Sequence, residues 1–333
     1  MGFLLNHFEG INTLFVRLLY LSFRMKLFRI FIFQIVFVTA VLSVQAQTFI
    51  SEKNLQLLNH YQDTLKVLSD SMLDSKDEMK RQGSCYQFIR TMVRALKVEG
   101  SFHFPFDALE RISILAPDDQ SFRILNWVLP FDDSTYRYYG TIQMNDLKQL
   151  KLFPLFDYSE FISKPADTLT NNEHWFGALY YRMLEVKSSG GKPYYLLFGW
   201  DGNDAHSHKK LIDVLSFNSK KQPVFGASLF DFGSYDPRNK IKRFILEYKE
   251  TAQVSIRYDD ELQMIVYDHL EPESPLTKDD YTTYVPDGSY EGFKWENGKW
   301  HHVENVFTTT QKEPPFPDPV DFGKQKKIYT PPK

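Results

Sequence analysis

The chain has 333 residues, of which 43 % are hydrophobic and 16 % aromatic, and it carries a formal net charge of −3. This mildly acidic balance excludes a nucleic-acid-binding protein, which needs a basic stripe, and the aromatic content excludes a disordered chain. The single cysteine, Cys85, excludes an intramolecular disulfide, so a hydrophobic core must stabilise the fold.

Residues 25–46 predict a signal peptide. Lys26 and Arg29 precede the uncharged run 30–44, and the small residues Val44 and Ala46 stand at the positions that signal peptidase reads. The run is shorter than the roughly 20 residues that a membrane-spanning helix needs, although an uncleaved anchor is the alternative interpretation. We therefore expect an exported protein of the periplasm or cell surface, secreted without a stable membrane span once the signal peptide is removed.

Residues 1–24 precede a signal peptide that is already complete from Met25, which indicates an over-called start. The alternative is one long, interrupted anchor over residues 13–44. Removing residues 1–46 takes away Glu9 and four bases, so the mature chain has 35 bases against 41 acids and a net charge of −6.

Residues 47–100 form a predicted helical segment. In the first helix, apolar residues from Leu55 to Met72 recur at three- and four-residue intervals, and Ser51 is the expected N-cap. In the second, Ser75 and Glu78 have the spacing of a capping box. Its expected buried face is Met79, Tyr86, Ile89, Val93 and Leu96.

Residues 101–307 form a predicted antiparallel β body, because short runs rich in Tyr, Phe, Ile and Val alternate with turn residues. The expected strands are 111–115, 122–129, 136–144, 179–186, 194–200, 211–217, 224–230, 243–249, 252–258 and 262–267, with two more beside Asn297-Gly298. Asn-Gly suits a type I′ turn, which predicts Trp295 opposite Trp300 and Phe293 opposite His302.

The predicted fold class is α+β and mainly antiparallel β, with the N-terminal helical pair packed on a β-meander body of two sheets or an irregular barrel. Quartets of strands over residues 111–158, 179–230 and 243–303 leave propeller-like four-stranded meanders as the alternative. Residues 308–333 carry six prolines and predict an extended tail.

The loop 199–208 is the densest polar cluster. Asp201, Asn203 and Asp204 offer oxygen ligands for calcium, and His206 and His208 offer nitrogen ligands for zinc. The spacing is not that of an EF-hand and a third zinc ligand is not identifiable. The alternative is a polar hairpin loop without metal, and we expect no other cofactor.

Phe293, Trp295, Trp300 and His302 form a second candidate site, an aromatic platform for a sugar or a protein partner. The alternative places these rings in the core.

Enzyme motifs such as G-x-S-x-G, H-E-x-x-H and the Walker loop are missing from the sequence. Whether the protein is an enzyme is therefore uncertain, and we lean against enzymatic activity. A glycosidase needs only two carboxylates, and the loop acids Asp201, Asp204, Asp231 and Asp236 are the candidates.

Four stretches resemble uncharacterised exported proteins of Gram-negative bacteria: 104–107 (Phe-Pro-Phe-Asp), 111–119 (Arg-Ile-Ser-Ile-Leu-Ala-Pro-Asp-Asp), 122–127 (Phe-Arg-Ile-Leu-Asn-Trp) and 199–203 (Gly-Trp-Asp-Gly-Asn). The resemblance implies one β unit and brings no activity.

Our leading hypothesis is a non-enzymatic binding or interaction protein with an envelope protein or glycan as partner. The alternatives are a hydrolase of glycans or another envelope polymer, and a structural or assembly factor.

Overall fold

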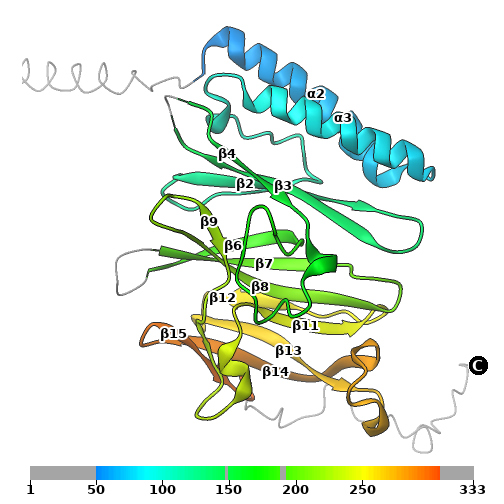
Figure 1. The fold of residues 1–333 in the computed structure, drawn as a ribbon, viewed down its shortest axis with the longest axis vertical. Coiled ribbons are helices and arrows are strands. Elements are labelled where there is room, and N and C mark those ends of the chain that lie inside the picture. The colour runs from blue at the N-terminus through cyan, green and yellow to red at the C-terminus, as the bar shows by residue number, and fades with distance from the viewer. Residues whose placement is uncertain (1–49, 147–148, 188–192, 308–333) are drawn as a thin grey trace, which may run out of the picture. The chain divides into compact units, whose positions relative to one another are not determined.

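The computed structural model describes residues 50–146, 149–187 and 193–307 (Figure 1). The predicted start (1–24), signal peptide (25–46) and proline-rich tail (308–333) lie outside these described residues. The chain divides into a unit of residues 1–56 and a unit of residues 57–333. In the first, residues 50–56 contain the start of helix α2 (Glu52–Asp74), where Asn54 N donates a hydrogen bond to Ser51 Oγ at 3.3 Å, as expected of an N-cap.

Helix α3 (Glu78–Leu96) differs from its prediction in both its cap and its buried face. Asp77 is the N-cap, because its carboxylate accepts hydrogen bonds from the N–H groups of the first turn, whereas Ser75 lies further out. Met79, Tyr86 and Val93 are exposed at 82 %, 57 % and 37 %, so the predicted face is wrong at these residues, whereas Leu96 is buried as predicted. The buried residues of α3 are Arg81, Cys85, Phe88, Thr91, Met92, Ala95 and Leu96.

The residues against which α3 packs determine which of its faces is buried. The Phe88 ring meets the Trp127 ring edge-on at 5.0 Å, and the Arg81 guanidinium donates to Pro130 O and Asp132 Oδ1. Cys85 is buried on the same face, and burial raises the pKa of its thiol to about 11, which makes it a small hydrophobic residue and a poor nucleophile at neutral pH. Among the described residues, neither helix is long and apolar enough to cross a membrane.

The strands of residues 57–307 form three sheets, which Figure 1 shows as successive layers. The first sheet has the order β1-β2-β3-β4, the middle sheet β5-β9-β8-β7-β6 with β11 also paired to β8, and the third sheet β10-β15-β14-β13-β12. The first sheet comprises β1 (Ser113–Leu115), β2 (Phe122–Pro130), β3 (Tyr136–Met144) and β4 (Leu152–Phe156). The middle sheet comprises β5 (Thr170–Asn171), β6 (Leu179–Lys187), β7 (Pro193–Asp201), β8 (Ser207–Phe217), β9 (Pro223–Phe225) and β11 (Phe244–Lys249). The third comprises β10 (Phe230–Asp231), β12 (Ile256–Asp259), β13 (Met264–Pro272), β14 (Tyr284–Glu296) and β15 (Lys299–Val303).

The fold class is α+β and mainly antiparallel β, as predicted, but its arrangement is neither two sheets nor a barrel. The quartet 111–158 matches the first sheet, whereas the other two quartets exchange strands: β11 pairs with β8 and β10 pairs with β15. The β10–β15 pair is parallel, an exception to the antiparallel pairing predicted for the β body. The hairpin at Asn297-Gly298 has the predicted register, with Trp295 opposite Trp300 and Phe293 opposite His302.

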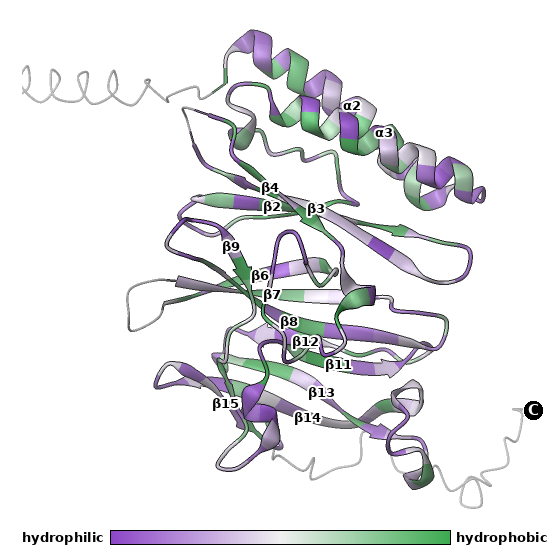
Figure 2. Cartoon of the chain, in the orientation of Figure 1, coloured by the Kyte–Doolittle hydropathy of each residue, from purple (hydrophilic) through white to green (hydrophobic). Residues whose placement is uncertain are grey.

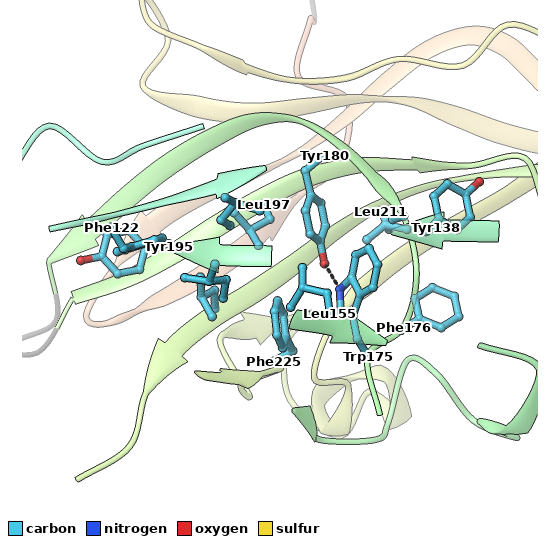
Figure 3. Packing of buried hydrophobic residues seen from close by; sticks show 14 residues of the cluster. Phe122, Tyr138, Leu155, Trp175, Phe176, Tyr180, Tyr195, Leu197, Leu211 and Phe225 are labelled. Atoms are coloured by element: carbon cyan, nitrogen blue, oxygen red, sulfur yellow. Dashed lines mark hydrogen bonds between the residues drawn. The ribbon is translucent and has the colours of Figure 1, made fainter. Parts of the chain in front are cut away.

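The middle sheet is buried on both faces, because successive residues of its strands enter different cores. Tyr195 and Leu197 of β7 pack with the first sheet, whereas Leu196 and Phe198 pack with the third. Figure 2 shows the matching apolar segments in the strands of all three sheets. In the first of these cores, drawn in Figure 3, Trp175 Nε1 donates a hydrogen bond to Tyr180 Oη at 2.8 Å.

A buried ion pair lies in the middle sheet beside that hydrogen bond. Asp213 and Arg243 both have fully buried side chains, and Arg243 Nε lies 3.1 Å from Asp213 Oδ1. The contact is an ion pair without the angle of a hydrogen bond, and the remaining guanidinium nitrogens donate to Pro165 O, Thr168 O and Thr170 Oγ1. Tyr180 Oη donates to the second oxygen of Asp213 at 3.3 Å. These contacts tie β8 and β11 to the segment before β5.

Candidate functional site

A cavity of about 700 Å³ opens where the first sheet meets the middle sheet. The start of β3, the segment that follows β4, and the ends of β7, β8 and β11 form its walls. Its volume lies within the range of about 300–1,000 Å³ typical of small-molecule sites. Its polar lining includes Tyr136, Tyr138, Asp157, Asp201, Asn203 and Lys209.

Asp201 is the most deeply placed acid of the cavity, with 6 % of its surface exposed. Its Oδ1 accepts hydrogen bonds from Asn203 N at 2.9 Å and from Tyr138 Oη at 3.2 Å. Gly202 N donates to Tyr138 Oη at 2.7 Å, and a Cβ on Gly202 would lie 2.4 Å from the Tyr136 ring. The loop therefore needs glycine at this position to hold the Asp201 carboxyl against β3.

The surroundings of the Asp201 carboxyl group favour its protonated form. Burial raises its pKa above the ordinary 3.8, and the charge of Asp157 adds to the rise, whereas Lys209 and the two hydrogen bonds lower it. Both hydrogen bonds that Asp201 accepts from described residues reach Oδ1. Oδ2 is consequently the oxygen that the fold leaves for a ligand in the cavity.

A network of fixed polar groups continues from Asn203 along the cavity wall. Lys209 Nζ donates to Asn203 Oδ1 at 2.6 Å and lies 3.8 Å from Glu247 Oε2. Ser207 Oγ accepts from Asn203 Nδ2 at 2.8 Å and donates to Glu247 Oε1 at 2.6 Å. The pairing of β8 with β11 places Glu247 directly opposite Lys209. These polar groups are thus oriented before any ligand binds.

Asp157 holds the other side of Tyr138. Its Oδ2 accepts from the Tyr138 backbone N–H at 2.9 Å, and its Oδ1 accepts from Ser159 N and Ser159 Oγ. A Cβ on Gly177 would lie 2.5 Å from the Asp157 carboxylate, so glycine makes room for this acid. Two carboxylates therefore flank one tyrosine, Asp157 at its backbone and Asp201 at its hydroxyl.

Aromatic side chains provide the apolar part of the cavity. Tyr136 meets Trp200 edge-on at 5.4 Å, and the Tyr158 and Phe161 rings lie 4.6 Å apart with an interplanar angle of 37°. Tyr158, Phe161 and Tyr281 are 38 %, 69 % and 54 % exposed. The Asp201 carboxylate thus lies in the interior of the cavity, and the exposed rings lie at its solvent side.

The five residues of the predicted metal loop do not converge on one point. Asp201 and Asn203 line the cavity, whereas Asp204 accepts hydrogen bonds from the N–H groups of His206 and Ser207 and thereby closes the loop. His206 is exposed. The His208 ring lies edge-on to Trp200 and to Tyr248, and burial lowers its pKa. Calcium or zinc binding by this loop remains a prediction.

The predicted aromatic platform is divided between core and surface. Phe293 is fully buried and Trp300 is 2 % exposed, so these two rings belong to the core between the middle and third sheets. Trp295 is half-buried, whereas the side chain of His302 is 7 % exposed and its Nε2 lies 3.0 Å from Glu291 Oε2. A sugar or partner at this hairpin would therefore meet the Trp295 side chain alone of the four.

In the described part of the chain, donor atoms suited to a metal gather at one other place, on the third sheet. His269, Glu271 and Asp287 each bring one donor atom within 4.8 Å of the others. His269 Nδ1 lies 2.9 Å from Asp287 Oδ2, which is a hydrogen-bonding distance. Exposed acids form such groups without a metal, so we build no proposal on this cluster.

Sequence reasoning identified Asp201 and Asn203 but missed Tyr138, Asp157 and Lys209. Tyr138 lies 63 residues before Asp201 in the chain, and no local pattern reports such a contact. The one available signal was Asp157-Tyr158-Ser159, where an acid two residues before a serine predicts the Asx turn that the structure contains.

No protein-family model, curated protein or solved structure matches this chain. The case for function therefore depends on the geometry of the chain itself.

Proposed function

We propose that this chain is an exported binding protein that holds a small polar ligand in the cavity between the first and middle sheets. The observation that carries the proposal is Asp201, a residue 6 % exposed that lines the cavity of about 700 Å³ and whose Oδ2 accepts no hydrogen bond from the described residues. A carboxylate oxygen that the described residues leave without a donor can accept a hydrogen bond from a ligand. Export is supported by the signal-peptide pattern of residues 25–46.

The substitution Asp201→Asn tests the proposal. Asparagine keeps the oxygen that accepts from Asn203 N and Tyr138 Oη, but it replaces Oδ2 with an NH₂ donor. Saturation-transfer NMR of the mature protein would be recorded with three probe sets, namely methyl glycosides, polyamines and free amino acids. We expect at least one probe set to bind the wild type and to lose binding in Asp201→Asn.

Asp119→Asn is the matched control, because Asp119 also accepts a backbone hydrogen bond in a turn, from Ser121 N, but does not line the cavity. It should bind the probes as the wild type does. The proposal is wrong if no probe set binds the wild type, or if Asp201→Asn binds as tightly as Asp119→Asn.

One observation favours a hydrolase of glycans as the second candidate. Burial and the Asp157 charge raise the pKa of Asp201, and a carboxyl of raised pKa near a second carboxyl is a feature of glycosidase sites. A 4-nitrophenyl glycoside assay separates the two functions. Turnover by the wild type that Asp201→Asn abolishes would establish a hydrolase, whereas binding without turnover supports a binding protein.

A further inference from the structure

The charges around the cavity restrict the ligand to a neutral or cationic molecule. Five acids line the cavity against three bases: Asp157, Glu160, Asp167, Asp201 and Glu247, and Arg137, Lys164 and Lys209. Lys209 is already engaged by Asn203 and Glu247, and Asp167 is paired with Lys240 at 3.5 Å. The excess of carboxylates repels an anion, so phosphate and carboxylate ligands are disfavoured.

The aromatic side chains restrict the ligand further. Tyr158 and Phe161 both line the cavity and leave 38 % and 69 % of their surfaces exposed, so a ligand in the cavity can cover them. The Tyr158 ring is supported edge-on by His174 at 4.8 Å, which fixes its orientation. A ligand that covers these rings must present an apolar face, while its edge must present donors to Asp201.

We infer that the ligand is a saccharide, whose pyranose ring has an apolar C–H face and an edge of hydroxyl groups. The C–H face would lie on Tyr158 and Phe161. One hydroxyl would donate to Asp201 Oδ2, and Lys209 and Asn203 would contact another. This inference rests on the proposed function and adds the chemical class of the ligand. A polyamine meets the carboxylates equally well but places a cation beside the Lys209 ammonium and offers no ring to the aromatic pair.

The test compares methyl glycosides, including that of N-acetylglucosamine, with putrescine and spermidine by saturation-transfer NMR and calorimetry. We expect a methyl glycoside to bind, with its ring protons closest to the protein, and Phe161→Ala to weaken it about tenfold, the equivalent of one lost aromatic contact. Phe307→Ala is the matched control, because Phe307 is 48 % exposed on the third sheet and packs on Tyr290. It should leave the affinity unchanged.

Two results would overturn the inference and leave the proposed function standing. One is binding of polyamines or amino acids, sensitive to Asp201→Asn, without binding of any glycoside. The other is glycoside binding that Asp201→Asn abolishes but that Phe161→Ala and Phe307→Ala affect equally. Because Phe161 is exposed, its replacement should leave thermal melting unchanged, so lost binding in that variant would not reflect unfolding.

Discussion

The ionised carboxylate that Asp201 would offer to a ligand lowers the stability of the folded protein. The pKa of Asp201 is higher in the folded protein than the 3.8 of an ordinary aspartate, so the folded protein binds more protons than the unfolded chain between the two pKa values. The free energy of unfolding therefore falls as the pH rises through this window and stays lowered above it. We expect Asp201→Asn, which cannot ionise, to melt at a higher temperature than the wild type at pH 7, with the difference shrinking towards pH 3.8.

Melting curves of both proteins from pH 3 to pH 8 measure this difference. Asp119→Asn again serves as the control, because Asp119 accepts its hydrogen bond at the exposed surface. If Asp201→Asn melts below the wild type at pH 7, ionised Asp201 stabilises the fold and the argument from burial is wrong. A variant that gains stability while losing the ligand would have the signature of a functional residue.

For the Asp213–Arg243 pair we expect removal of the acid to destabilise the protein, because here both charges are buried and neutralise each other. Asp213→Asn leaves the Arg243 guanidinium buried without its counter-charge. We expect a loss of about 3–5 kcal/mol in the free energy of unfolding, measured by urea denaturation. Asp236→Asn, which weakens the surface pair with Arg238, should cost far less. Equal losses in the two variants would contradict the argument from burial.

The backbone conformation of a glycine decides whether its replacement by alanine stabilises a helix or destabilises a turn. Gly83 lies inside α3, and an added Cβ would meet no atom within 4 Å. Gly83→Ala should therefore stabilise the protein by about 0.5–1 kcal/mol. Gly298 has φ 83° in the turn between β14 and β15, so Gly298→Ala should destabilise it by about 1–2 kcal/mol. Urea denaturation of both variants checks the prediction, and a shift of the same sign in both would refute it.

Elements defined by local chemistry were predictable, and those defined by distant contacts were not. Asn297 and Gly298 both adopt the positive φ of a type I′ turn, so two residues were enough to set the register of the β14–β15 hairpin. By contrast, β11 follows β10 in sequence but pairs with β8 of another sheet. The face of α3 was mispredicted for the same reason, since Trp127 of the first sheet selects it.

The residues of the candidate site also divide into those set by local sequence and those set by distant contacts. Asp201 and Asn203 were found because one short loop concentrates acids, amides and histidines, whereas the second carboxylate, Asp157, comes from the segment after β4. The pairing of β3 with β4 brings Asp157 to the backbone of Tyr138, and only the stacking of the first sheet on the middle sheet brings Asp201 to its hydroxyl. Sheet stacking depends on which apolar faces meet, and a strand that is apolar on both faces, such as β7, does not specify its partners.

At the scale of the 57–307 region, the middle sheet should make the two cores unfold together. Leu196 and Leu197 are adjacent in β7 and fully buried, yet Leu196 enters the core with the third sheet and Leu197 the core with the first. Either side chain replaced by alanine should cost about 2–5 kcal/mol. Because one strand serves both cores, we expect each substitution to lower the stability of both.

Fluorotryptophan NMR in urea measures each core separately, because Trp175 lies in the first core and Trp300 in the second. The native resonances of both should disappear at one urea concentration in the wild type, and at one lower concentration in Leu196→Ala and in Leu197→Ala. Val67→Ala, at a residue 68 % exposed on α2, should shift neither. If Leu196→Ala lowers the midpoint of Trp300 alone, the third sheet unfolds separately. Most of the cavity wall, including Phe176, would then depend on the first and middle sheets.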